Sequence, residues 1–229
     1  MRCTFASYNI HKAVGLDRRR DPERILAVLG EMDADVVVLQ EVDRRFGARE
    51  TALPRQMVEE AQWQIAAVAR RPLSIGWHGN AVLVRRDWTL LEANRIDLPV
   101  LEPRGAVSAL VEAPDGTRLQ VAGMHLDLSG FRRRHQVEAV CAALGRPRLP
   151  TVMMGDLNEW SREKGALAAF DDHWRIVTPG PSYPSRRPVA RLDRAILSEH
   201  WQVVDVEVHH SVLAARASDH LPIRAVLEI

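Results

Sequence analysis

The chain lacks the features that hold together disulfide-rich, zinc-binding and membrane-spanning proteins. Cys3 and Cys141 are its only cysteines, and they lie too far apart to outline a disulfide framework or a zinc site. No apolar run approaches the roughly 20 residues that cross a bilayer. The first residues also lack the charged leader and long apolar stretch of a signal peptide. We therefore expect a reduced, cytoplasmic protein with no stable membrane insertion.

An excess of one charge is also missing. The 31 lysines and arginines balance 30 acidic residues, which leaves a net charge of +1. No strong overall field attracts nucleic acid or anionic membrane. Tight sequence-independent binding to DNA needs many phosphate contacts, so the balance disfavours it. Lysine is scarce, because Lys12 and Lys164 are the only two.

The periodicity of the 229 residues is that of an α/β protein. Apolar residues at helical spacing predict helices over residues 22–32, after Pro54 through Val68, around 137–144 and over 163–170. Short apolar or alternating runs predict the strands, at residues 5–10, 35–39, 79–84, 88–96, 105–112, 118–126, 151–154, 192–197, 203–208 and 222–227. Helices alternate with strands at both ends of the chain, around a β-rich middle. This order predicts one α/β domain over residues 1–229 with mixed sheets.

Polar side chains cluster where the predicted strands end. In open α/β sheets the strand ends form the ligand crevice, so groups far apart in sequence can converge there. The clusters are Asn9-Ile10-His11, Gln40-Glu41-Val42-Asp43, His125-Leu126-Asp127, Asp156-Leu157-Asn158, Arg191-Leu192-Asp193 and Ser218-Asp219-His220. The Asp-x-Asn segment is also an ordinary turn sequence, so it is informative only together with the others.

Three of these residues carry hard oxygen ligands. Asn9, Glu41 and Asp219 offer the amide and carboxylate oxygens that Mg²⁺ and Mn²⁺ prefer. No cysteine or histidine cluster has zinc spacing, which argues against a soft metal. We predict a magnesium site, with Mn²⁺ as a possible substitute.

Five further residues fit proton transfer and charge stabilisation. Asp193 can pair with His220, fix its tautomer and raise its basicity. Asp156 and Asn158 can hold an attacking water, while His125 and Asn158 can donate to phosphoryl oxygens as negative charge builds. With no nucleophilic serine or cysteine motif, the set points to metal-assisted hydrolysis of a phosphoester.

Three more side chains are candidates for substrate contact. Asn80, Arg104 and His11 can each reach a phosphate near these strand ends. Asn80 and His125 could instead satisfy backbone groups in the crevice floor, as buried polar side chains usually do. Asp193 could likewise be a structural acid paired with Arg194.

Seven segments, in order, resemble the motifs of the endonuclease/exonuclease/phosphatase superfamily, from deoxyribonuclease I to the deadenylases. They are Tyr8-Asn9-Ile10, Leu39-Gln40-Glu41-Val42, Gly79-Asn80-Ala81, His125-Leu126, Gly155-Asp156-Leu157-Asn158, Leu192-Asp193-Arg194 and Ser218-Asp219-His220-Leu221-Pro222. The resemblance implies a four-layer α/β sandwich, two packed mixed β-sheets flanked by helices. It also implies that Glu41 is the principal metal ligand beside Asn9, that Asp193 and His220 form an acid–imidazole dyad, and that Asp219 lies beside the metal or the dyad.

Differences from the larger families reduce the number of subfamilies that the chain resembles. Met124-His125-Leu126 is of the histidine type, unlike exonuclease III, and the Trp-Cys-Asp-Arg signature of inositol phosphatases is absent before Asp193. Asn9-Ile10-His11-Lys12 and Ser182-Tyr183-Pro184-Ser185 look most like small bacterial members of unassigned substrate. We therefore expect a monomeric Mg²⁺-dependent phosphodiesterase of the nuclease type. A phospholipid- or phosphomonoester-hydrolysing enzyme and a catalytically inactive binding module stay open as alternatives.

The arginines offer one more hypothesis. Four clusters, at residues 18–20, 44–45, 132–134 and 186–187, fall in or beside the loops that should surround the pocket. They either form a positively charged rim that guides a phosphodiester or reflect the general arginine bias of the chain.

Overall fold

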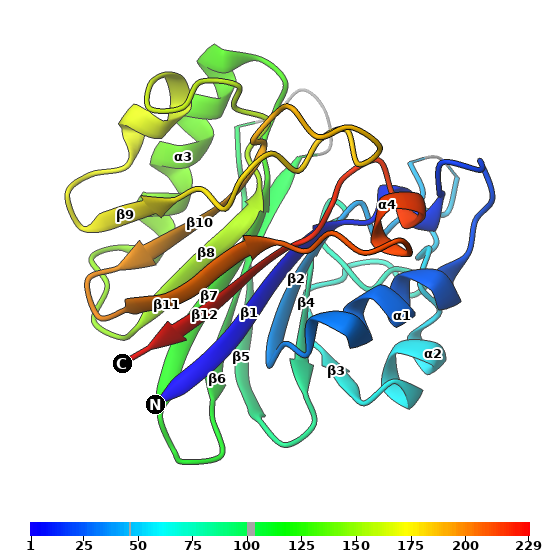
Figure 1. The fold of residues 1–229 in the computed structure, drawn as a ribbon. Coiled ribbons are helices and arrows are strands. Elements are labelled where there is room, and N and C mark those ends of the chain that lie inside the picture. Colours follow the sequence, from blue (N-terminus) through cyan, green and yellow to red (C-terminus); the bar gives the residue numbers. More distant parts are fainter. Residues whose placement is uncertain (46, 100–103) are drawn as a thin grey trace.

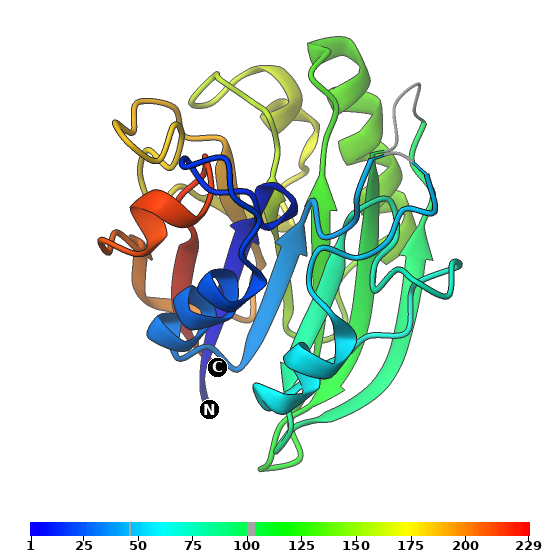
Figure 2. The ribbon, with the colours of Figure 1, turned by 90° about the vertical axis from the view of Figure 1, so that its right-hand side faces the viewer.

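Two six-stranded sheets pack face to face and carry helices on their outer sides (Figure 1). The computed structural model describes residues 1–45, 47–99 and 104–229. Figure 2 shows the two sheets and the helices outside them in a view turned by 90°. The predicted four-layer α/β sandwich is therefore confirmed. Within the described residues, no helix is both long and apolar enough to cross a membrane.

The first sheet contains the amino- and carboxyl-terminal strands. Its order is β11 (Gln202–Val208), β12 (Ile223–Glu228), β1 (Arg2–Asn9), β2 (Val36–Gln40), β4 (Ala81–Arg85) and β3 (Trp63–Ile65). β1 and β2 are parallel, and the other neighbours are antiparallel. The carboxyl ends of β1 and β2 therefore lie at the same edge as the start of β12.

The second sheet is built mainly from the middle of the chain. Its order is β5 (Thr89–Ile96), β6 (Gly105–Glu112), β7 (Arg118–His125), β8 (Thr151–Asp156), β10 (Asp193–Ser198) and β9 (Trp174–Val177). β7 and β8 are parallel, whereas β10 is antiparallel to β8. The ends of β7 and β8 and the start of β10 therefore share one edge.

Three apolar clusters separate the layers. Side chains from both sheets, such as Phe5, Val38, Val107 and Val121, form the cluster between them. α1 (Pro22–Met32), α2 (Arg55–Glu60) and α4 (Ala214–Ala217) contribute to the cluster outside the first sheet. α3 (Gly130–Leu144) covers the second sheet. The sheets thus form a rigid base for the loops at their shared edge.

The helix predicted over residues 22–32 is confirmed as α1. The Asp21 carboxylate accepts a hydrogen bond from the Arg24 backbone N–H, and Pro22 occupies the first turn. Such a cap satisfies one of the backbone donors that a helix start leaves unpaired. The helix ends at Met32 and is followed by Asp33, which has a left-handed backbone.

The predicted helix after Pro54 is wrong beyond residue 60. α2 stops at Glu60, Gln62 takes a positive φ of 69°, and Trp63–Ile65 becomes an edge strand against β4. The apolar spacing suited either structure, and pairing with β4 decided between them. The predicted helix over 163–170 is a short 3-10 helix, η2 (Gly165–Ala169). β9, α4 and the 3-10 turn η1 (His11–Ala13) were not predicted.

Gly155 is a position where the fold requires glycine. Its φ is +156°, and a Cβ built there would lie 1.9 Å from the carbonyl oxygen of Met124 on the adjacent parallel strand. Because the obstacle is backbone, no side-chain rotation can relieve it. Gly155 directly precedes Asp156, so this close strand contact also fixes the position of that carboxylate.

We expect Gly155→Ala to lower the free energy of unfolding by about 3 kcal/mol or more, because the strained φ and the backbone clash add together. Gly30→Ala, in α1 with open space around its Cβ, should instead raise it by about 0.5 kcal/mol. Urea unfolding followed by circular dichroism measures both. Equal stability of Gly155→Ala and the unmodified protein would contradict the close contact.

Candidate active site

The first sheet supplies one side of the candidate active site. Asn9 ends β1, and Glu41 directly follows β2. Asp219 and His220 lie just before β12, which runs antiparallel to β1. The Ser218 hydroxyl donates to the Asn9 carbonyl at 2.7 Å, so the loop before β12 is attached to the end of β1. Asn9 and Ser218, which are 209 positions apart in sequence, are thereby neighbours.

The second sheet supplies the other side. His125 and Asp156 end the parallel strands β7 and β8 and lie opposite each other in register. Asp193 begins β10 and pairs in register with Asp156. Hydrogen bonds join the two sides at this edge: the Asn9 amide donates to Asp156 Oδ2 at 3.1 Å, and His220 Nδ1 lies 2.9 Å from Asp193 Oδ2. The strand-end residues predicted to converge are therefore brought together.

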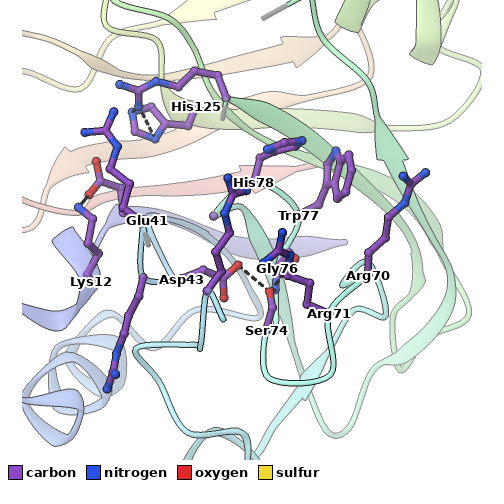
Figure 3. Close-up of a pocket in the computed structure, with 15 residues that line it drawn as sticks. Lys12, Glu41, Asp43, Arg70, Arg71, Ser74, Gly76, Trp77, His78 and His125 are labelled. Atoms are coloured by element: carbon purple, nitrogen blue, oxygen red, sulfur yellow. Dashed lines mark hydrogen bonds and ion pairs between the residues drawn. The ribbon is translucent and has the colours of Figure 1, made fainter. Parts of the chain in front are cut away.

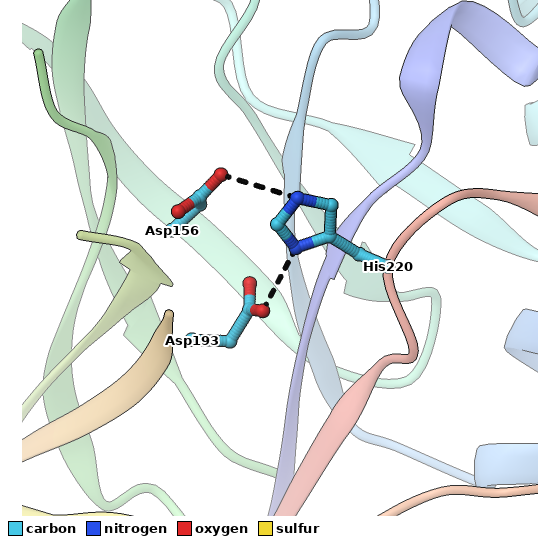
Figure 4. Close-up of side chains that lie close together, drawn as sticks. All are labelled: Asp156, Asp193 and His220. Atoms are coloured by element: carbon cyan, nitrogen blue, oxygen red, sulfur yellow. Dashed lines mark hydrogen bonds and ion pairs between the residues drawn. The ribbon is translucent and has the colours of Figure 1, made fainter. Parts of the chain in front are cut away.

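His220 lies between two buried carboxylates (Figure 4). Its Nδ1 faces Asp193, and its Nε2 lies 3.6 Å from Asp156 Oδ2. The Ser182 hydroxyl donates to the same Asp193 oxygen, and the Tyr183 ring lies 4.8 Å from the imidazole. Asp193 and Ser182 thus fix the ring so that Nε2 points toward Asp156.

The charge state of His220 follows from this environment. Burial alone would lower its pKa, but the carboxylates of Asp193 and Asp156 outweigh burial and raise the pKa to about 10. The imidazole is therefore a cation at neutral pH. In the described part of the chain Asp193 forms its ion pair with His220 and none with Arg194, whose guanidinium donates to the Ser161 carbonyl at 3.1 Å.

Asp156 is the centre of the site. Besides Asn9 and His220, its Oδ2 lies 3.4 Å from His125 Nε2. Its other oxygen accepts from the Asn158 backbone N–H at 2.9 Å. The Asn158 side chain donates to the Leu126 carbonyl, which joins the segment after β8 to the end of β7. Asn158 itself has a positive φ of 50°, an uncommon backbone that such contacts stabilise.

His125 differs from His220 in charge. Complete burial lowers its pKa to about 3, with Asp156 opposing and the Arg104 guanidinium reinforcing the shift. A guanidinium nitrogen of Arg104 lies 3.0 Å from Nδ1 of the ring. The site therefore pairs a neutral imidazole with a cationic one on either side of Asp156.

Glu41 is held by Lys12. The residue has a positive φ of 57°, and its carboxylate forms an ion pair with the Lys12 ammonium. Burial would raise the pKa of the Glu41 carboxyl, but Lys12 holds it below its ordinary value. Lys12 lies in η1, where His11, Lys12 and Ala13 all have positive φ. Lys12 was not predicted as a site residue, although it is one of only two lysines in the chain.

The oxygen donors of Glu41, Asn9 and Asp219 are of the kind that a hard divalent cation prefers. Glu41 and Asp219 offer partly exposed carboxylates, at 24% and 34% exposure, and Asn9 offers an amide oxygen that accepts from the His11 N–H at 3.1 Å. A cation there would take over from the Lys12 ammonium as the partner of Glu41.

A second group with metal-ligand chemistry is Asp156, Asp193 and His220, whose ligand atoms lie within 4.8 Å of one another in the described chain. In this group the Nδ1 atom of His220 is bonded to Asp193. We therefore interpret the three residues as an acid–imidazole pair, Asp193 and His220, beside the carboxylate of Asp156. The sequence predicted this pair.

The predicted substrate contacts differ in position. Arg104 lies against His125. His11 is partly exposed, with Nδ1 3.1 Å from the Val14 carbonyl and 3.9 Å from Asp219. Asn80 is fully buried, and its amide donates to the Gly105 carbonyl at 3.0 Å. Asn80 therefore stabilises the loop beneath the site, and its contact with phosphate stays a prediction.

The arginine clusters differ in their relation to the cavity beside Glu41. Arg44 and Arg45 line the cavity beside Glu41, but no residue of 18–20, 132–134 or 186–187 does so. Arg133 is buried instead and donates to the Leu128 carbonyl and to Glu159. The cavity has other basic residues that no sequence motif marked: Arg49, Arg70 and Arg71.

The comparisons with known proteins agree with this geometry. Residues 6–220 match the endonuclease/exonuclease/phosphatase family. An endonuclease/exonuclease/phosphatase from Beutenbergia cavernae DSM 12333 is 22% identical, with a TM-score of 0.75 over 100% of this chain and 72% of that one. Humanized D. rerio TDP2 is 16% identical, with a TM-score of 0.78 over 100% of this chain and 99% of that one.

A mannosyl-6-phosphatase from Bacteroides thetaiotaomicron is 18% identical, with a TM-score of 0.74 over 99% of this chain and 100% of that one. No curated protein matches the sequence significantly. At these identities the solved structures show the fold, and the sequence match over residues 6–220 shows the family. The chain belongs to the endonuclease/exonuclease/phosphatase family, whose members are metal-dependent hydrolases of phosphoester bonds, and is a hydrolase of this class.

Proposed function

We propose that the protein is a Mg²⁺-dependent phosphodiesterase that uses water as the nucleophile. One observation carries the proposal. Asp156 Oδ2 lies 3.4 Å from the neutral His125 and 3.6 Å from the cationic His220, while Asn9 donates to it at 3.1 Å. A water and a phosphoryl group beside Asp156 would meet a proton acceptor and two imidazoles together.

Each residue of the site has its own role in the in-line attack of water on the phosphoryl group. Asp156 and the segment of Asn158 hold the water, and Asp156 takes its proton, because the imidazole of His220 is already protonated. His125 and the cationic His220 face the oxygens on which negative charge builds. Asp193 and Ser182 keep His220 oriented. Glu41, Asn9 and Asp219 would hold the divalent cation, which when bound polarises the phosphoryl group.

The serine hydroxyls nearby do not compete as nucleophiles. Ser182 is buried and donates to Asp193, and Ser185 is buried and donates to the Ser218 carbonyl. Water is therefore the nucleophile that the geometry favours.

A phosphomonoesterase is the second candidate, because one structural neighbour is a mannosyl-6-phosphatase. Another neighbour is D. rerio TDP2 complexed with a single-strand DNA product, which keeps nucleic acid among the candidate substrates. The carboxylates and imidazoles brought together at Asp156, Asp193, His125 and His220 argue against an inactive binding module. We also propose that residues 1–229 form one domain, and that the protein is monomeric and cytoplasmic; the apolar cluster shared by both sheets supports the single domain.

We expect hydrolysis of bis(4-nitrophenyl) phosphate in Mg²⁺ or Mn²⁺, and a loss of roughly 10²-fold or more when EDTA removes the metal, because the developing charge loses its counter-ion. Release of nitrophenolate measures the rate, and 4-nitrophenyl phosphate in parallel separates diester from monoester cleavage.

Thermal unfolding in EDTA is the control, since chelation should leave the protein folded. Full activity in EDTA would contradict the metal requirement, and faster cleavage of the monoester would favour the second candidate.

A further inference from the structure

A cavity of about 340 Å³ extends away from the catalytic groups (Figure 3). Lys12, Glu41 and His125 line one end, and Trp77 and Arg70 lie toward the other. Apart from Lys12, its basic lining is arginine: Arg44, Arg45, Arg49, Arg70, Arg71 and Arg104. The two carboxylates in the lining, Glu41 and Asp43, are far outnumbered.

The carboxylates of the cavity are already engaged. Glu41 pairs with Lys12, and Asp43 accepts from the Ser74 hydroxyl at 2.6 Å. Arg44 pairs with Glu50 at 2.8 Å. Across residues 1–45, 47–99 and 104–229, no ion pair joins Arg49, Arg70 or Arg71 to a carboxylate. The lining of the cavity therefore carries an excess of positive charge.

Trp77 holds part of this charge in place. The Arg70 guanidinium lies 4.8 Å above its ring, and that of Arg95 lies 5.5 Å from it. A guanidinium stacked on an aromatic face keeps the N–H groups at its edge available for a planar or tetrahedral anion. Stacking also reduces the entropy that such a long side chain loses when it binds.

The wall holds polar atoms that lack a protein partner. Trp77 Nε1 and His78 Nδ1 are buried, and neither forms a hydrogen bond within the described part of the chain. Burial lowers the pKa of His78, and the nearby Arg49 and Arg70 lower it further. Trp77 and His78 both line the cavity, and the positive field around them favours an anion.

We infer that this cavity binds a second phosphate group, carried by a small substrate a few bonds from the phosphodiester that is cleaved. The inference rests on the proposed phosphodiesterase activity. The excess of guanidinium groups suits a phosphate dianion, which accepts paired N–H donors. A volume of about 340 Å³ suits a compact substrate.

Two matched diesters test the inference. One is 4-nitrophenyl propyl phosphate, and the other carries a terminal phosphate on its propyl chain. We expect kcat/KM to be roughly 10- to 100-fold higher for the phosphorylated diester, the range for charge-assisted hydrogen bonds. Arg49→Gln with Arg70→Gln should abolish this ratio. Arg118→Gln is the control. Arg118 begins β7 whereas His125 ends it, so Arg118 lies far from the cavity, and it pairs with Glu112.

Calorimetric binding of inorganic pyrophosphate to the metal-free protein provides a readout that needs no turnover. The double variant should bind it at least roughly tenfold more weakly, and Arg118→Gln should bind it normally. If neither diester is cleaved but this pattern holds, the proposed function fails and the anion site stands. The anion site would be overturned if the kcat/KM ratio of the two diesters were the same in all proteins. It would also be overturned if the double variant bound pyrophosphate as tightly as the unmodified protein. A single-stranded oligonucleotide that competes more tightly than pyrophosphate would overturn the small substrate.

Discussion

His220→Ala is expected to lower kcat by roughly 10²–10⁴-fold, the range for a lost acid–base group. The variant removes the cation whose Nε2 lies 3.6 Å from Asp156, and it leaves Asp193 without the partner at 2.9 Å. Both effects act on the transition state, in which charge builds on the phosphoryl oxygens. KM should change much less than kcat, because this charge is smaller in the bound substrate.

The matched control for His220 is His210→Ala. His210 is exposed on the loop after β11, so its variant should retain full activity. Thermal unfolding of both variants separates catalytic loss from misfolding. A folded His220→Ala protein with normal turnover of bis(4-nitrophenyl) phosphate would contradict the assignment of the Asp193–His220 pair.

Asp156→Asn is expected to have an effect as large or larger, roughly 10³-fold or more in kcat, because it removes both the proton acceptor and the anion between two imidazoles. The change keeps the size of the side chain. It replaces the acceptor of the Asn9 amide, however, and it removes one of the carboxylates that raise the pKa of His220. Steady-state kinetics on the same diester measures the loss.

Asp205→Asn is the control for this second variant. Asp205 is an exposed acid on β11 whose contact with Arg224 is long, at 3.9 Å. The variant should be fully active and equally stable. Comparable activity of Asp156→Asn and Asp205→Asn would show that the water is activated elsewhere.

The sequence predicted those parts of the site that follow from strand ends. Asn9, Glu41, His125, Asp156 and Asp193 each lie at a strand boundary, and a buried strand has a strong apolar signal. Once the sheet order is known, the parallel pairs and the antiparallel β10 and β12 bring these residues to one edge. The apolar pattern of the strands and the order of the strands in the sheets are therefore enough to predict where these five residues lie.

The parts that could not be predicted depend on loop conformation. Lys12 reaches Glu41 only because three consecutive residues of η1 adopt positive φ, which no sequence pattern signals for His-Lys-Ala. Ser182 meets Asp193 across an 11-residue separation in irregular structure. Arg70 belongs to the loop before β4, and its stacking on Trp77 depends on tertiary packing.

The same limit applies to the misassigned second helix. Ile65 and Val68 fit a helical stripe after Pro54, but the turn at Gln62 and pairing with β4 redirect the chain. A short apolar segment does not reveal whether its periodicity is 3.6 or 2 residues. The neighbouring strand determines the outcome.

The division of the site between two sheets has a consequence for how the enzyme loses its function. Asn9 ends β1 of one sheet, and Glu41 and His220 lie in loops beside its strands β2 and β12, whereas His125, Asp156 and Asp193 belong to strands of the other sheet. The apolar cluster between the sheets and the contacts of Asn9 with Asp156 and of His220 with Asp193 set the spacing between the two halves of the site. A displacement of about 1 Å can cost an enzyme roughly 10²-fold in rate. A small displacement of one sheet relative to the other would thus abolish activity while every helix and strand stayed intact. Turnover is therefore a more sensitive measure of how the two sheets pack than any measure of secondary structure.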